Sequence, residues 1–189
     1  MKKSNRRPKI SRSKTVLHIL TGSIAAYKAC DLIGPLKRLG ARVVCIMTDS
    51  AKEFITPLTL RALTGEKVFF DFFAADVPYN VQHISLADEA DLILVAPASA
   101  NFIARLAAGF ANDLASCVIL SARCPIVIAP AMNDQMYEHP ITQENIQKLK
   151  KVGCHFVEPI VGDLACGKKA VGHIADTSQL IATVQKLLN

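Results

Sequence analysis

Six short hydrophobic runs recur along the chain, separated by longer segments of helical character. The runs cover residues 15–20, 41–48, 67–70, 91–98, 125–131 and 154–159. Each is apolar without the in/out alternation of a strand that faces water, which is typical of strands buried on both faces of a parallel sheet. We therefore predict an α/β fold with a doubly wound, Rossmann-like parallel sheet, three α/β/α layers and a single domain.

Helical periodicity and stop signals place the helices between these runs. We expect helices over residues 24–39, 56–65, 99–109, 112–122, 140–152 and 176–188. Pro35 falls inside the first of these and predicts a kink or an early end, because proline lacks the N–H that a helix interior needs. The segment before the last helix, residues 160–173, is predicted to be an irregular loop.

The composition favours a folded domain over a membrane-spanning one. Hydrophobic residues make up 51% of the 189 residues, enough for a sizeable core. The longest apolar stretch, residues 91–111, is interrupted by Pro97, Asn101 and Arg105. No uninterrupted run therefore approaches the roughly 18 residues of a membrane helix. The high apolar content instead predicts buried parallel strands or surface buried between subunits.

Positive charge is concentrated at the start of the chain. Seven of the 22 lysines and arginines lie in residues 1–14, and the rest of the chain is close to neutral. This segment lacks aromatic residues and the apolar core of a secretory signal. We expect a disordered basic head over residues 1–14 and a folded domain over residues 15–189. A nucleic-acid-binding tail is the alternative, and it predicts steeply salt-dependent binding.

The six cysteines occur without a CxxC pair or the spacing of a metal site. Four lie in apolar stretches, where a free thiol behaves as a small hydrophobic residue. This use of cysteine predicts a reducing, cytoplasmic setting, no disulfides and no bound metal. Cys166 differs from the others, because it lies among small residues in a segment with three glycines, residues 162–172.

Small and polar residues follow four of the predicted strands. They form the segments TGS (21–23), TDS (48–50), PASAN (97–101) and PAMN (130–133). In a doubly wound sheet the carboxyl ends of the strands meet at one edge, where ligands bind. Hydroxyls, amides and backbone N–H groups at helix starts suit a phosphorylated, planar, heteroaromatic ligand. The segments TGS and TDS, taken alone, are also explained by helix capping.

Four longer motifs, in this order, resemble those of one known family. They are TGSIAAYKA (21–29), PASANFIARLAAGFANDLAS (97–116), PAMNDQMYEHP (130–140) and GDLACG (162–167). On these motifs the chain resembles the flavin-containing cysteine decarboxylases. The resemblance implies a flavodoxin-like fold, an FMN cofactor, a homo-oligomer that is a trimer or a dodecamer, and no nucleic-acid or membrane partner. The implied reaction is decarboxylation of 4′-phosphopantothenoylcysteine to 4′-phosphopantetheine in coenzyme A biosynthesis.

The resemblance also implies a role for each matching residue. The residues implied for the FMN phosphate region are Gly22, Ser23, Ile24 and Thr48. Those implied for the flavin ring are Ser99, Ala100 and Asn101. The implied catalytic residues are His83, beside the ring, and Cys166, which gives a proton in the last step. The substrate carboxylate is expected at Asn133, with Met132 and Met136 as its apolar neighbours.

Structural alternatives and departures from the family stand beside these expectations. Asn133 equally suits the N-cap of a helix that starts at the next residue, with the methionines as core filler, and His83 suits an ordinary surface position. Phe102 stands where a hydroxyl residue is usual. The segment after Cys166 lacks the usual arginine, which leaves Lys168 or Lys169 as a candidate cation. Rival functions are a peptide cysteine decarboxylase of the lantibiotic type, a flavin prenyltransferase and a non-catalytic regulatory flavoprotein.

Overall fold

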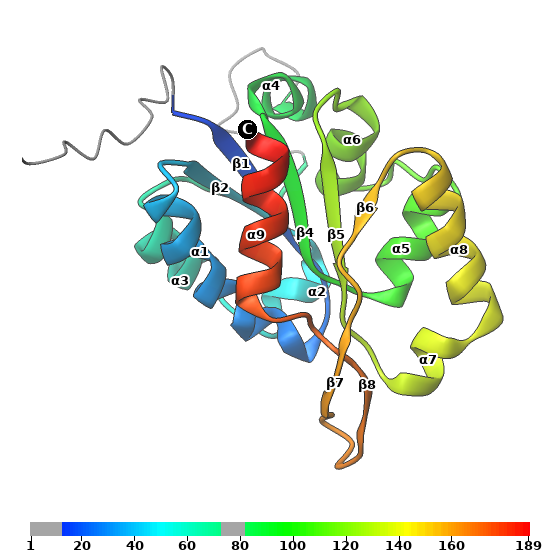
Figure 1. The fold of residues 1–189 in the computed structure, drawn as a ribbon. Coiled ribbons are helices and arrows are strands. Elements are labelled where there is room, and N and C mark those ends of the chain that lie inside the picture. Colours follow the sequence, from blue (N-terminus) through cyan, green and yellow to red (C-terminus); the bar gives the residue numbers. More distant parts are fainter. Residues whose placement is uncertain (1–12, 73–81) are drawn as a thin grey trace, which may run out of the picture.

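A six-stranded parallel sheet forms the centre of the computed structural model, which describes residues 13–72 and 82–189. The strand order is β3-β2-β1-β4-β5-β6, and every neighbouring pair is parallel. The strands are β1 (Thr15–Leu20), β2 (Arg42–Met47), β3 (Val68–Phe69), β4 (Leu92–Ala98), β5 (Ile126–Pro130) and β6 (His155–Phe156). The order reverses between β1 and β4, so the chain winds first to one edge and then to the other (Figure 1). The predicted doubly wound parallel sheet is confirmed.

Helices cover both faces of this sheet and complete the three predicted layers (Figure 1). The helices of one face are α1 (Ala29–Arg38), α3 (Pro57–Thr64) and α9 (Thr177–Leu188). Those of the other are α4 (Gln82–Glu89), α5 (Ala100–Ala107), α6 (Leu114–Ser121) and α8 (Pro140–Lys151). Successive strand residues feed opposite cores, with Leu20 in one and Ile19 in the other. Both faces are therefore apolar, which explains the lack of alternation in the sequence.

The first predicted helix differs from the expectation. Residues Ile24–Lys28 form a 3-10 helix, η1, and α1 follows it with Pro35 inside. The break thus lies at the start of the segment and not at the proline. Leu32, Ile33 and Leu36 of α1 are each no more than 1% exposed, and this packing against the sheet holds the helix together across Pro35.

The predicted loop over residues 160–173 is wrong. This segment forms an antiparallel hairpin of β7 (Ile160–Asp163) and β8 (Lys169–His173), separate from the main sheet. Gly167 makes its turn with φ of 81°, and its N–H donates to Leu164 O at 2.9 Å. The strands are short and contain glycine, so the sequence shows no hydrophobic periodicity from which they could be predicted. Figure 1 shows the hairpin beyond the carboxyl ends of the central strands.

The remaining short helices lie at the same carboxyl edge. They are α2 (Asp49–Lys52) after β2 and α7 (Asp134–Glu138) after β5. The predicted basic head lies outside the described residues except for Ser13 and Lys14. Among the residues that the structure describes, no helix has the length and apolar character needed to cross a bilayer. All six cysteines are free, and burial raises the pKa of Cys45 to about 12.

Candidate functional site

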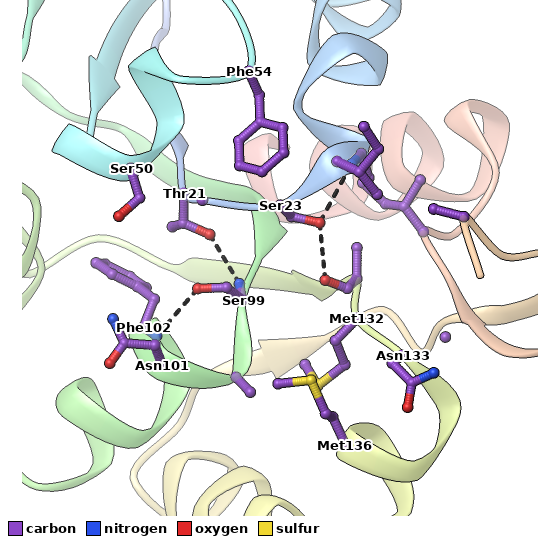
Figure 2. Close-up of a pocket in the computed structure, with 18 of the residues that line it drawn as sticks. Thr21, Ser23, Ser50, Phe54, Ser99, Asn101, Phe102, Met132, Asn133 and Met136 are labelled. Atoms are coloured by element: carbon purple, nitrogen blue, oxygen red, sulfur yellow. Dashed lines mark hydrogen bonds between the residues drawn. The ribbon is translucent and has the colours of Figure 1, made fainter.

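A pocket of about 900 Å³ opens at the carboxyl edge of the sheet. The loops after β1, β2, β4 and β5 and the hairpin β7–β8 line it, so all four predicted strand-end segments meet there. In Figure 2, Thr21, Ser23 and Ser50 lie on one side of the pocket, with Met132 and Met136 on the other. The pocket lies where the strand order reverses, the usual position of a ligand in this kind of sheet.

Ser23 joins two of these loops. Its hydroxyl donates to Ala131 O at 3.0 Å, in the loop after β5, and accepts from Ala25 N at 3.3 Å. The side chain therefore caps η1 and also fixes the loop between β1 and η1, which lines the pocket through Gly22, Ser23 and Ile24. The capping interpretation of this segment is confirmed, and the same bond shapes the pocket wall.

Gly22 and Thr48 bring the ends of β1 and β2 together. A Cβ atom on Gly22 would lie 2.4 Å from Ser50 Cβ, so only glycine permits this close approach. Thr48 precedes α2 but makes no side-chain capping bond. Its Oγ1 is buried and has no hydrogen-bond partner within the described chain. A buried hydroxyl in a pocket wall without a partner is suited to a polar ligand atom.

Thr21 links the ends of β1 and β4. Its hydroxyl donates to Pro97 O and accepts from Ser99 N, both at 2.8 Å. Ser99 in turn caps α5, its Oγ accepting from Phe102 N at 3.3 Å. Ala100 and Asn101 follow in the first turn, and Asn101 presents an exposed side-chain amide on the pocket wall (Figure 2).

Asn133 and Cys166 meet in the same pocket, although 33 residues separate them. Asn133 Oδ1 accepts from Gln135 N at 3.0 Å, which makes it the N-cap of α7 as the structural alternative predicts. Its Nδ2 lies 3.8 Å from Cys166 Sγ, toward which it donates. One side chain therefore uses its oxygen for the helix and leaves its N–H₂ group to the pocket, beside an exposed thiol.

Gly172 holds the hairpin in position for this contact. Its carbonyl accepts from Met132 N at 3.1 Å. Its φ is 127°, and a Cβ atom there would lie 2.2 Å from Met132 O. Met132 is half-buried next to the α7 cap, and Met136, 50% exposed, points into the same region (Figure 2). Both methionines line the pocket, as the sequence predicts.

Replacing Gly172 with alanine is expected to release the hairpin from the loop after β5. The substitution adds a strained backbone conformation, costing about 1–3 kcal/mol, to a steric clash with backbone atoms. Faster amide hydrogen exchange across residues 160–173 is the expected measurement. Gly167→Ala is the matched control, since Gly167 also has positive φ but has nothing within 4 Å of the added Cβ. Equal exchange in the two variants would contradict this account.

His83 is the predicted site residue that a single chain does not bring to the pocket. It lies in the first turn of α4 and stacks on Phe72, with the ring centroids 5.6 Å apart. It is not among the described residues that line the pocket. Two other histidines have structural partners. His18 is fully buried, burial lowers its pKa to about 4, and it bonds Ala96 O at 2.8 Å. His139 caps α8.

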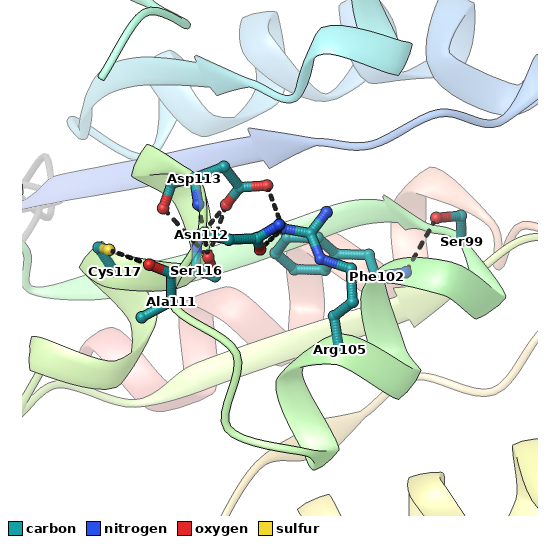
Figure 3. A network of polar contacts seen from close by, with 8 residues as sticks. All are labelled: Ser99, Phe102, Arg105, Ala111, Asn112, Asp113, Ser116 and Cys117. Carbon is teal, nitrogen blue, oxygen red and sulfur yellow. Dashed lines mark hydrogen bonds and ion pairs between the residues drawn. The ribbon is translucent and has the colours of Figure 1, made fainter. Parts of the chain in front are cut away.

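A polar network forms a part of the wall that the sequence analysis missed. Arg105 Nη2 lies 2.6 Å from Asp113 Oδ2 and also donates to Asn112 Oδ1 (Figure 3). Asp113 forms a capping box with Ser116 at the start of α6. Burial opposes its ionisation, but hydrogen bonds from Ser116 and Arg105 outweigh this and hold the pKa of Asp113 below its usual value. The capping-box spacing was the available sequence signal for Asp113.

A second pair of wall residues was also missed. Lys28 Nζ lies 2.9 Å from His173 Nε2, across 145 residues of sequence. His173 Nδ1 lies 3.0 Å from Ile174 O. Both Lys28 and His173 line the pocket, whereas Lys168 and Lys169, the candidate cations from the sequence, are exposed on the hairpin and do not. Lys28 on η1, and not a hairpin lysine, therefore lines the pocket.

Comparison with known proteins agrees with this geometry. The Flavoprotein family model matches residues 4–189. A probable phosphopantothenoylcysteine decarboxylase from Streptococcus mutans is 46% identical over 178 residues, covering 93% of this chain and 99% of the relative. The coenzyme A biosynthesis bifunctional protein CoaBC of Bacillus subtilis is 44% identical over 174 residues. The chain covers 43% of that longer protein.

Solved structures show the same fold. A PPC decarboxylase mutant complexed with pantothenoylaminoethenethiol superposes with a TM-score of 0.84 at 30% identity, covering 93% of this chain and 98% of the other. The FMN-dependent cysteine decarboxylase SpaF gives 0.81 at 28% identity, with 93% and 95% covered. The chain therefore belongs to the Flavoprotein family, in the group that contains the phosphopantothenoylcysteine decarboxylases.

Proposed function

We propose that this protein is an FMN-dependent decarboxylase that converts 4′-phosphopantothenoylcysteine to 4′-phosphopantetheine, a step of coenzyme A biosynthesis. The observation that carries the proposal is the convergence of the Asn133 amide and the Cys166 thiol, 3.8 Å apart, in the pocket at the switch point of the sheet. An amide that binds a carboxylate and a thiol that gives a proton are the protein groups this reaction needs. The relatives named for the same reaction support it.

The pocket residues fit FMN. Gly22 adds no side chain to the pocket wall, and the buried Thr48 hydroxyl in the same wall has no hydrogen-bond partner within the described chain, which suits a phosphate at the start of a helix. Gly22, Ser23, Ile24 and Thr48 would hold the phosphate region. Ser99, Ala100 and Asn101 would lie along the ring. A cavity of about 900 Å³ is at the upper end of the range for small-molecule sites, which leaves room for cofactor and substrate together.

The chemistry divides between cofactor and protein. Bound FMN would oxidise the cysteine thiol of the substrate to a thioaldehyde and later return the electrons. Asn133, held by its capping bond, presents N–H donors to the substrate carboxylate. A neutral amide orients that group without the full positive charge that would oppose loss of CO₂. Met132 and Met136 exclude water from the carboxylate.

Cys166 completes the reaction. Loss of CO₂ leaves an enethiolate, whose electron pair must take a proton at the carbon that carried the carboxylate. The Cys166 thiol, exposed to the pocket and beside Asn133, is placed to give that proton. A peptide decarboxylase that stops at the enethiol has no need of this group, so Cys166 favours the complete reaction to the saturated product.

The direct test is product analysis. We expect the purified protein to be yellow with noncovalent FMN and to convert 4′-phosphopantothenoylcysteine to a product lighter by one CO₂, detected by mass spectrometry. The amide bond that joins the pantothenoyl group to the cysteine of the substrate should remain intact. A colourless protein that takes up no FMN on titration, or a flavoprotein that leaves this substrate unchanged, would refute the proposal.

We also propose a homo-oligomer, a trimer or a dodecamer, in a cytoplasmic setting. His83 lies outside the pocket of its own chain, so a second copy is needed to bring it beside the flavin. Ile84 on α4, Leu120 on α6 and Phe110 are exposed apolar side chains of the kind that subunit interfaces bury. The six free cysteines support the reducing setting.

Subunit complementation tests the shared site. His83→Ala and Asn133→Asp, each inactive alone, are expected to regain activity when co-expressed and co-purified through separate tags. Random mixing would restore both groups in about a quarter of the pockets. The activity is measured per bound FMN, with each singly expressed variant as the control. Mixed oligomers without activity, or a monomer by light scattering, would exclude a pocket completed by His83 of another copy.

A further inference from the structure

Some of the charged side chains that line the pocket are paired with an opposite charge, and Lys28, within the part of the chain that the structure describes, is not. Arg105 is paired with Asp113 at 2.6 Å, and Asp49 with Lys52 at 2.8 Å. Asp163 on β7 lies in register with Lys169 on β8. Lys28 is the lining cation with no carboxylate partner among the residues that the structure describes. Its positive charge is therefore available to an anionic ligand in the pocket.

His173 holds this ammonium group without neutralising it. The carbonyl oxygen of Ile174 only accepts, so the bond at 3.0 Å requires a proton on His173 Nδ1. In the neutral ring Nε2 then carries the lone pair and accepts from Lys28 Nζ at 2.9 Å. The pair keeps a net positive charge, and two of the three ammonium N–H donors remain for a ligand.

The imidazole ring is itself fixed by the hairpin. A Cβ atom on Gly162 of β7 would lie 2.9 Å from His173 Cγ, so glycine at this position makes the room that the ring occupies. Lys28 and His173 are both half-buried. A long lysine side chain held by such a partner loses less conformational entropy when it binds a ligand.

The position of the pair indicates which anion it meets. His173 follows Gly172, whose carbonyl accepts from Met132 N, so Lys28 contacts the same hairpin that places Cys166 beside Asn133. The surface suited to the FMN phosphate is formed instead by Gly22, Thr48 and Ser50, at the ends of β1 and β2. Lys28 and Asn133 line the same pocket, so a substrate whose carboxylate is at Asn133 has this cation available for a second anionic group.

We propose that Lys28, positioned by His173, binds the terminal phosphomonoester of the substrate and so selects the phosphorylated form. This inference rests on the proposed decarboxylase function and assigns the substrate-phosphate contact to η1 and β8. Charge-assisted hydrogen bonds to a phosphate are among the stronger polar contacts in proteins. His173 is a positioning residue, because it acts through the lysine.

The test compares the KM values for 4′-phosphopantothenoylcysteine and unphosphorylated pantothenoylcysteine. In the wild-type protein we expect the phosphorylated substrate to have the lower KM. Lys28→Met is expected to raise that KM by about 10- to 100-fold and to collapse the ratio of the two values. His173→Ala should act in the same direction, and His173→Gln, which keeps an acceptor for the ammonium, should restore most of the ratio. The double variant should be no worse than Lys28→Met.

Lys169→Met is the matched control, since it removes the same charge from an exposed position on the hairpin. An unchanged ratio in Lys28→Met, an equal collapse in Lys169→Met, or a raised FMN dissociation constant in Lys28→Met with no change in the ratio would overturn the inference. A wild-type protein that decarboxylates both substrates without preference would overturn it while leaving the proposed function intact. Turnover of neither substrate would remove the proposed function, and this inference with it.

Discussion

Replacing Asn133 with aspartate is expected to lower kcat for decarboxylation by at least about 10²-fold, the usual effect of losing one well-placed donor to a reacting anion. The new carboxylate also repels the substrate carboxylate. Aspartate caps a helix as well as asparagine does, so the bond from Gln135 N and the start of α7 should be preserved. The melting temperature and FMN content should match those of the wild type.

Gln135→Glu is the control for this variant. Gln135 is exposed and lies two residues after Asn133. Its replacement with glutamate adds the same negative charge and leaves the side-chain amide of Asn133 unchanged. We compare the steady-state kinetics of the two variants, with FMN absorbance to confirm that each is loaded. A loss of kcat in Asn133→Asp alone is due to the carboxylate at position 133, whereas an equal loss in both is due to the added negative charge. Wild-type turnover in Asn133→Asp would remove Asn133 from the carboxylate site.

Replacing Cys166 with serine is expected to stop the reaction after loss of CO₂. A serine hydroxyl is far less acidic than a thiol, and loss of a general acid typically costs roughly 10²–10⁴-fold in rate. The oxidised enethiol should accumulate in place of 4′-phosphopantetheine, and the yellow colour of the enzyme should bleach, because the electrons are not returned. Mass spectrometry of the products and the visible spectrum together measure this.

Cys154→Ser is the matched control, because Cys154 is a free, partly buried cysteine outside the pocket. It should leave both the product and the spectrum unchanged. Formation of the saturated product at the normal rate by Cys166→Ser would show that another group gives the proton.

The architecture could be predicted because its signals are local. Continuous apolar runs identified the parallel strands, since a strand covered on both faces has no polar side to show. The position of the pocket followed from the same pattern, because carboxyl ends of parallel strands share one edge. Ser23 and Asn133 were correctly taken as possible helix caps, and the structure shows that capping and pocket lining coexist in both.

The hairpin and the contacts it makes could not be predicted in the same way. Residues 160–173 form two short, glycine-containing strands without hydrophobic periodicity. Contact with the loop after β5, through the bond from Met132 N to Gly172 O, holds the hairpin in place. The Lys28–His173 pair joins residues 145 apart, and Ser23 reaches Ala131 across 108. No local pattern carries the information that two such segments will touch.

The sequence by itself determined the sheet, its layers, the edge at which ligands bind and the residue types available there, because each depends on burial and capping within one segment. The tertiary structure alone decided which of those residues face one another. Close approach at Gly22 and Gly172, where an added Cβ would fall 2.4 Å and 2.2 Å from neighbouring atoms, sets the shape of the pocket. It brings Cys166 to Asn133 and Lys28 to His173, and His83 lies outside the pocket of its own chain.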